Sequence, residues 1–124
     1  MVVSYRDLSV WQRAMSLVEL TYSLTTKLPH GEVYGLKPQL QRAAVSVPSN
    51  IAEGHARHST KEYLRFLSVA LGSLAELETQ FLLCQRLDLL PGNDIDEVLR
   101  VADEIGKMIR GLRKGLTDRL TRDG

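Results

Sequence analysis

Hydrophobic residues recur along most of this chain at intervals of three and four residues, which is the spacing of one face of an α-helix. No stretch shows the alternation of apolar and polar residues that is typical of a half-buried β-strand. Three of the four prolines stand where the apolar rhythm stops and starts again. The pattern therefore predicts four helices, at about residues 7–26, 37–56, 60–87 and 94–121.

Each predicted helix carries an apolar stripe that we expect to face a shared core. The first stripe is Leu8, Trp11, Met15, Val18 and Tyr22. The second is Leu40, Ala43 or Ala44, Val47 and Ile51. The third is Tyr63, Leu67, Ala70, Leu74, Leu77, Phe81 and Cys84. The fourth is Ile95, Val98, Ala102, Ile105, Ile109, Leu112 and Leu116. These stripes predict an all-α, antiparallel up-and-down four-helix bundle that forms a single domain over residues 1–124.

Local signals support these helix ends. Pro38 suits a first helical turn, where its missing N–H would have no partner anyway. Ser59 and Glu62 have the spacing of a capping box at the start of the third helix. Asn93 or Asp94 is expected to cap the fourth helix.

The composition is that of a soluble globular domain, with 44% hydrophobic and 25% charged residues. A net charge of +1 gives no overall attraction to nucleic acid or anionic lipid. The lone Cys84 cannot form an internal disulfide, and neither a leader nor an apolar run of about 20 residues is apparent. We therefore expect a cytoplasmic protein without a membrane segment.

Two helices carry more apolar residues than one core stripe needs. Between Phe66 and Gln85 the only charges are Glu76 and Glu78. The apolar residues outside the predicted stripes are Leu64, Leu71, Leu82 and Leu83 in the third helix, and Leu17, Leu20 and Leu24 in the first. Such surplus commonly marks a contact with another chain, which predicts a homo-oligomer. The alternative is that these side chains broaden the core or are scattered on the surface.

The second helix contains the unusual stretch "AAVSVPSNIAEGHAR", residues 43–57. Pro48 removes one N–H from the helix and clashes with the carbonyl of Ala44, so we expect a bend there. The hydroxyl of Ser46 or Ser49 and the amide of Asn50 could satisfy the freed backbone atoms. Gly54 lets a neighbouring helix approach closely, or lets the chain leave the helix.

Charged residues near this stretch are expected to be structural. Carboxylates on a largely apolar segment usually need a cationic partner. We therefore expect ion pairs between Arg42, Glu53 and Arg57 of the second helix and the segment "GSLAELE", which contains Gly72, Glu76 and Glu78.

The segments "VWQRAMSL", "YGLKPQLQRAAVSVPSNIAEGHAR" and "EYLRFLSVALGSLAELETQ" together resemble the four helix bundle protein family, the 23S rRNA intervening-sequence proteins. Some members are encoded inside inserts in bacterial large-subunit ribosomal RNA genes. The resemblance implies a cytoplasmic bacterial protein that forms a ring of five protomers. It also implies similarity to the accessory variability determinant of diversity-generating retroelements, which binds its reverse transcriptase and nucleic acid through a basic ring surface. Those accessory subunits look strongly basic, whereas this chain is nearly neutral.

The predicted last helix is acidic in its first half and basic in its second. The basic residues are Lys107, Arg110, Arg113, Lys114, Arg119 and Arg122. This order complements the helix dipole, which is a sufficient structural explanation. The alternative is that an oligomer repeats these charges and builds a basic surface for RNA or DNA phosphates. No aromatic residue is interleaved with them, so such binding would be non-specific.

No motif indicates catalysis or a cofactor. His55, His58 and Glu62 have a spacing that could gather metal ligands, but Gly54 and the Ser59 cap interrupt the helix among them. We therefore expect neither a metal nor a cofactor. The leading hypothesis is a non-enzymatic, self-assembling bundle that acts as a binding or scaffolding module. The alternative is an accessory protein that holds RNA, DNA or a nucleic-acid enzyme on its basic surface.

Overall fold

The computed structural model describes residues 4–123. It contains four long helices and two short 3₁₀ turns, in the order η1 (Tyr5–Asp7), α1 (Ser9–Thr25), η2 (His30–Glu32), α2 (Leu36–Ala56), α3 (Thr60–Arg86) and α4 (Gly92–Asp123). The four predicted helices are confirmed, each end lying within two residues of its expected position.

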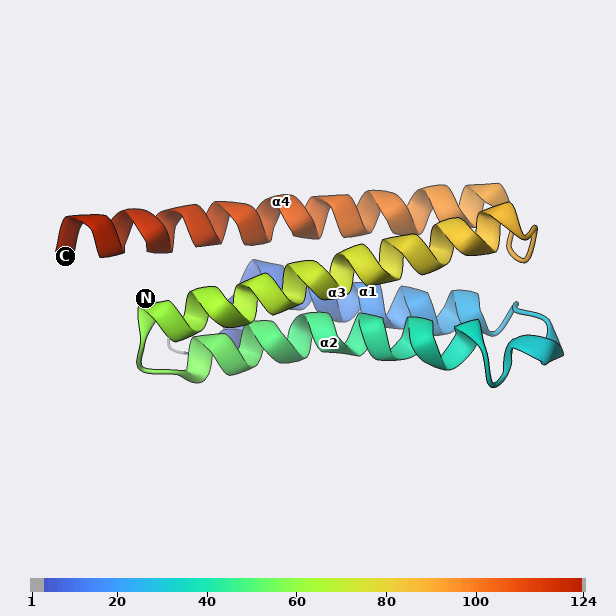
Figure 1. Cartoon of the computed structure of the whole chain (residues 1–124), viewed down its shortest axis with the longest axis horizontal. Helices are drawn as coiled ribbons and strands as arrows, with labels where there is room; N and C mark the ends of the chain where they lie inside the picture. The colour runs from blue at the N-terminus through green and yellow to red at the C-terminus, as the bar shows by residue number, and fades with distance from the viewer. Residues whose placement is uncertain (1–3, 124) are drawn as a thin grey trace.

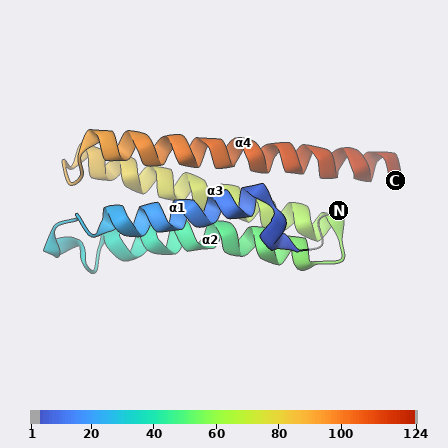
Figure 2. The same ribbon diagram turned by 180° about the vertical axis from the view of Figure 1, so that it is seen from behind.

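Consecutive helices run in opposite directions along a common long axis (Figure 1). Each helix packs against its two neighbours in a closed cycle, α1 on α2, α2 on α3, α3 on α4 and α4 on α1. Seen from behind, the same four rods lie side by side, and α4 extends past the ends of the other three at its C-terminal end (Figure 2). The fold is the predicted four-helix bundle.

The start of α3 is capped as predicted. The Glu62 N–H donates to Ser59 Oγ at 3.3 Å. The Glu62 carboxylate does not complete the capping box, because it accepts instead from Arg65 at 2.9 Å. Pro38 is the third residue of α2 and so lies in its first turn, as expected.

The start of α4 differs from the prediction. The helix begins at Gly92, so Asn93 and Asp94 lie inside its first turn and do not cap it. The Ile95 N–H donates to the Pro91 carbonyl at 3.2 Å, which places the first helical bond earlier than expected. Asp94 pairs with Lys27 at 2.8 Å and places negative charge at the positive end of the α4 dipole.

The core confirms the predicted stripes of α2, α3 and α4 almost completely. Of these stripe residues only Tyr63 and Leu112 remain partly accessible. Buried Val101 and Gly106 widen the stripe of α4. Cys84 is fully buried, as its place on the α3 stripe predicts.

The stripe predicted for α1 is confirmed only in part, because the helix is rotated so that another apolar face points inward. Leu8, Trp11 and Val18 of the predicted stripe are partly buried and pack against the edge of the core. The buried residues of α1 are Val10, Ala14, Leu17, Thr21, Leu24 and Thr25. Leu17 and Leu24, expected outside the core, are therefore part of it. Both faces repeat at intervals of three and four, and the face that is buried includes the small side chains of Ala14 and Thr21, each with no exposed surface. Met15 and Tyr22 of the predicted stripe are 41% and 45% exposed.

By length and composition α3 could cross a membrane, so the expectation of a protein without a membrane segment stays a prediction. Its most apolar window of 18 residues has a mean hydropathy of 1.3, and 44% of that window is buried inside the bundle. The core helix of a soluble protein has these same properties. Polar Ser73 and Gln80 are among the buried residues of α3.

Candidate functional site

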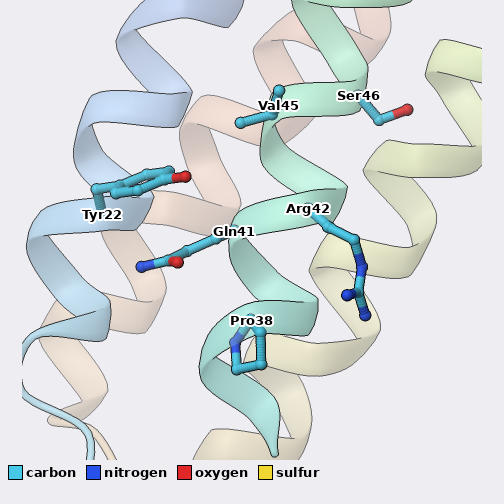
Figure 3. Close-up of a pocket in the computed structure, with 6 residues that line it drawn as sticks. All are labelled: Tyr22, Pro38, Gln41, Arg42, Val45 and Ser46. Atoms are coloured by element: carbon cyan, nitrogen blue, oxygen red, sulfur yellow. The ribbon is translucent and has the colours of Figure 1, made fainter. Parts of the chain in front are cut away.

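The side of the bundle formed by α1 and α2 is hollowed and apolar. One hollow, of about 330 Å³, is lined by Tyr5, Trp11, Met15, Val18, Val45, Pro48, Ser49 and Ala52. A second, of about 470 Å³, is lined by Tyr22, Pro38, Gln41, Arg42, Val45 and Ser46. Val45 lines both, so we treat them as one α1–α2 groove. Tyr22 and Gln41 approach each other across it, while Arg42 and Ser46 point toward α3 (Figure 3).

The α1–α2 groove owes its apolar character to the rotation of α1. The stripe that the sequence suggested for the core instead lines one wall of the groove, including Trp11, Met15, Val18 and Tyr22. Tyr5 packs edge-on against Trp11, with ring centroids 5.3 Å apart, and closes one end. Sequence reasoning found these residues but placed them inside the protomer.

A second exposed apolar surface lies at the end of α3, and we call it the α3 patch. It consists of Leu82, Leu83 and Leu87, which are 43%, 43% and 58% exposed. Thr79 and Arg86 flank a shallow hollow beside the first two leucines. The predicted surplus of apolar residues outside the core stripe of α3 is thus confirmed for Leu82 and Leu83. Leu64 and Leu71 instead pack against the core, as does Leu20 of α1.

The Pro48 stretch is a polar contact between α2 and α3. α2 remains helical through Pro48. Asn50 Nδ2 donates to the Ser46 carbonyl at 2.7 Å and to Ser46 Oγ at 2.9 Å. The Ser46 hydroxyl lies 2.7 Å from the Ser73 hydroxyl of α3. Asn50 therefore organises the turn before Pro48, and the hydroxyl pair joins the two helices.

Gly54 allows a close approach of α2 to α3. A Cβ at this position would lie 2.9 Å from Phe66 Cβ and 2.9 Å from Tyr63 Cδ1. Real Cβ atoms do not approach other atoms so closely, so glycine is required by packing. Gly72 differs, because a Cβ there would meet nothing within 4 Å.

The expected ion pairs between α2 and α3 were wrong. No ion pair within residues 4–123 involves Arg42, Glu53, Arg57, Glu76 or Glu78. The carboxylate of Glu76 instead accepts weakly from Gln80 at 3.5 Å. Arg42, Glu53 and Glu76 are exposed, and for exposed charges an ion pair gains little over hydration while costing side-chain entropy.

Arg57 contacts an aromatic ring rather than a carboxylate. Its guanidinium lies 5.0 Å from the centroid of the Phe66 ring, and the guanidinium of Arg65 lies 4.6 Å from the same centroid. Cation–π attraction therefore replaces the predicted ion pair.

Glu78 lies beside α4 in a small pocket with Asp103, Gly106 and Arg110. Burial raises the pKa of Glu78, the nearby Asp103 raises it further, and Arg110 partly opposes them. A carboxyl whose pKa is higher in the folded chain binds a proton more readily there than in the unfolded chain. The stability it contributes is present in acid and is lost as pH rises through the folded-state pKa.

The Glu78→Gln variant is therefore expected to be more stable than the wild type near neutral pH. The amide imitates the protonated carboxyl, so the two proteins should have similar stability in acid, below the unfolded pKa of the carboxyl. Urea unfolding in acid and at neutral pH measures this difference, with exposed Glu76→Gln as the control. A Glu78→Gln midpoint no higher than that of wild type at neutral pH would contradict it.

Two of the six basic residues predicted on α4 are neutralised on their own helix. Lys107 pairs with Asp103 at 3.2 Å, and Lys114 pairs with Asp118 at 3.1 Å. These pairs support the structural explanation for the charge pattern.

The four arginines of that set make no ion pair within the part of the chain that the structure describes. Arg110 folds over Gly106, and Arg113 is half-buried. Arg119 and Arg122 are exposed near the C-terminal end of α4. The basic surface is thus smaller than the sequence suggested.

The histidines do not gather with acidic residues. Among residues 4–123 no group of three His, Cys, Asp or Glu side chains could hold a metal ion. His55 packs edge-on against Tyr63, with ring centroids 5.8 Å apart, and Glu62 is engaged by Arg65. Burial raises the pKa of the Cys84 thiol, as does nearby Glu32, against a smaller opposing backbone hydrogen bond. Cys84 is thus a protonated core residue.

Residues 6–111 match the family model described as 23S rRNA-intervening sequence protein. The chain is also similar to a crystal structure of a protein with unknown function from the S23 ribosomal protein family, from Bacteroides thetaiotaomicron, with a TM-score of 0.79. The two are 20% identical, and the match covers 85% of this chain and 98% of that one, which shows a shared fold. No protein with a curated description matches the chain in sequence.

Proposed function

Because the chain belongs to the 23S rRNA-intervening sequence protein family, we propose that it is a non-enzymatic, self-assembling bundle that acts as a binding or scaffolding module in the bacterial cytoplasm. The observation that supports self-assembly most directly is the α1–α2 groove. Aromatic and aliphatic side chains line it where a solitary bundle would be expected to carry polar ones.

The two apolar surfaces suggest how copies would meet. The α1–α2 groove is built from η1, α1 and α2, whereas the α3 patch comes from the end of α3, so the surfaces share no residue. A contact between the patch of one copy and the groove of the next is therefore heterologous. Repeated head-to-tail contacts close into a ring when the rotation per copy allows. A ring of five is the size that the family resemblance implies.

Sedimentation equilibrium at micromolar concentration tests this proposal. We expect a single species of several copies, and five copies of a 13.9 kDa chain weigh about 70 kDa. A monomer at that concentration would refute self-assembly.

The second candidate is an accessory protein that binds RNA, DNA or a nucleic-acid enzyme such as a reverse transcriptase. What favours it is the C-terminal end of α4, where Arg119 and Arg122 are exposed and make no ion pair in the described chain. A ring would bring several such ends to one face. The internal pairing of Lys107 and Lys114 argues for the first candidate instead.

Salt dependence separates the two candidates. Each phosphate contact that a cation makes to a single strand contributes about −0.7 to the slope of log K against log salt. For the second candidate we expect a clearly negative slope in filter binding with single-stranded RNA. A slope near zero would dispose of it, and a normal ratio of absorbance at 260 and 280 nm in purified protein would agree with that result.

A further inference from the structure

The turn between α2 and α3 forms a pocket with the basic end of α4. The pocket has a volume of about 290 Å³ and is lined by His55, Arg57, His58, Ser59, Thr60, Tyr63, Leu116 and Arg119. Three separate segments of the chain contribute to it: the end of α2, the start of α3 and the last third of α4 (Figure 1).

We propose that this pocket binds a phosphate group. The basic residues that line it are two arginines and two histidines, and no carboxylate lines it. The acidic residues nearest in sequence to Thr60 and Arg119 are engaged elsewhere: Glu62 with Arg65, and Asp118 with Lys114. The Arg57 and Arg119 guanidiniums make no ion pair within residues 4–123 and carry forked donors suited to a phosphate.

Backbone N–H groups at the start of α3 add uncharged donors to the same pocket. α3, which is 27 residues long, begins at Thr60, and the N–H groups of its first turn point toward its N-terminal end. Ser59 takes up two later N–H groups, from Glu62 and Tyr63, which leaves those of Thr60 and Lys61.

The chemistry selects a tetrahedral phosphate oxyanion. Two guanidiniums and a helix N-terminus suit a phosphate better than a singly charged, planar carboxylate. The pocket is larger than one phosphate group, so the group can be carried by a nucleotide or by a nucleic-acid strand as well as occur free in solution. This site involves neither the α1–α2 groove nor the α3 patch, and it does not depend on self-assembly.

Titration of isotope-labelled full-length protein, followed by NMR, tests the proposal. The probes are inorganic phosphate, adenosine 5′-monophosphate and a short single-stranded RNA, each at constant ionic strength, with acetate as the control anion. We expect saturable shifts of the Thr60 and Lys61 amide signals with at least one phosphate probe and none with acetate. The probe that binds tightest identifies the source of the phosphate.

Variants decide whether the shifts come from this pocket. We expect Arg119→Gln and Arg57→Gln each to weaken the binding about tenfold. Arg119 is exposed and makes no side-chain hydrogen bond in the described chain, so its loss should not disturb folding. Arg100→Gln is the matched control, because it removes one exposed positive charge elsewhere on α4 and should leave the affinity unchanged. No saturable shift with any phosphate probe, or equal affinities of Arg119→Gln and wild type, would overturn the proposal.

Discussion

Replacing Gly54 by valine is expected to lower the free energy of unfolding by about 3 kcal/mol. A Cβ at residue 54 would stand 2.9 Å from Phe66 Cβ and 3.3 Å from the Tyr63 carbonyl oxygen. These atoms belong to the backbone of α3 or are bonded directly to it, so no side-chain rotation can relieve the clash, and α2 and α3 must separate. For a domain of this size the thermal midpoint should fall by more than about 10 °C.

The matched control is Gly72→Ala in α3, which removes the conformational freedom of a helical glycine without any clash. It should raise the free energy of unfolding by about 1 kcal/mol. Urea unfolding of all variants at one protein concentration measures both changes, since assembly adds to apparent stability. If Gly54→Val were as stable as wild type, the close contact between α2 and α3 would be wrong.

Mixing two assembly-defective variants is expected to give a dimer of one copy of each. Leu83→Asp places a charge in the α3 patch, and Val45→Asp places one in the α1–α2 groove. A buried charge without a partner costs about 3 kcal/mol or more, so each contact should weaken at least a hundredfold. Each variant alone should therefore be a monomer. In the mixture, the intact groove of Leu83→Asp can bind the intact patch of Val45→Asp. The two surfaces left free in this dimer both carry the added charge, so no further copy can bind.

Light scattering coupled to size-exclusion chromatography measures these masses, and circular dichroism checks that the variants remain folded. Val33→Asp is the control, because it changes an exposed apolar residue in the connection between α1 and α2, outside both surfaces. It should assemble like wild type. Should Leu83→Asp assemble normally, the contact does not use the α3 patch. Two monomeric variants that fail to pair would argue against a head-to-tail arrangement.

The local sequence pattern could not predict the proposed phosphate pocket. Sequence reasoning grouped Arg119 with the other cations of the last helix and treated His55 and His58 as weak metal candidates. The fold instead brings Arg119 to the α2–α3 turn, beside Arg57 and both histidines. About half the chain length separates the residues of the turn from Arg119, so only packing of α4 against the bundle could bring them together.

The α2–α3 contact was predicted in part. The role of Gly54 as a place of close approach followed from its missing Cβ, and the structure confirms it. The partners of the charged residues did not follow, because an exposed charge is nearly as stable in water as in an ion pair. Arg57 therefore lies over Phe66, and Arg42 stays without an ion pair in the described chain.

The sequence by itself determined the number of helices, their ends to within two residues, and the inward faces of α2, α3 and α4. Each of those helices has one dominant apolar stripe, and burying it is the largest favourable term available. Only the tertiary structure decided the rotation of α1, which carries two apolar stripes of the same spacing. Hydrophobicity cannot choose between them. Close packing can, because it depends on side-chain size and shape as well as on hydrophobicity. The face that is buried includes the small residues Ala14 and Thr21, and Trp11, Met15 and Tyr22 line the groove.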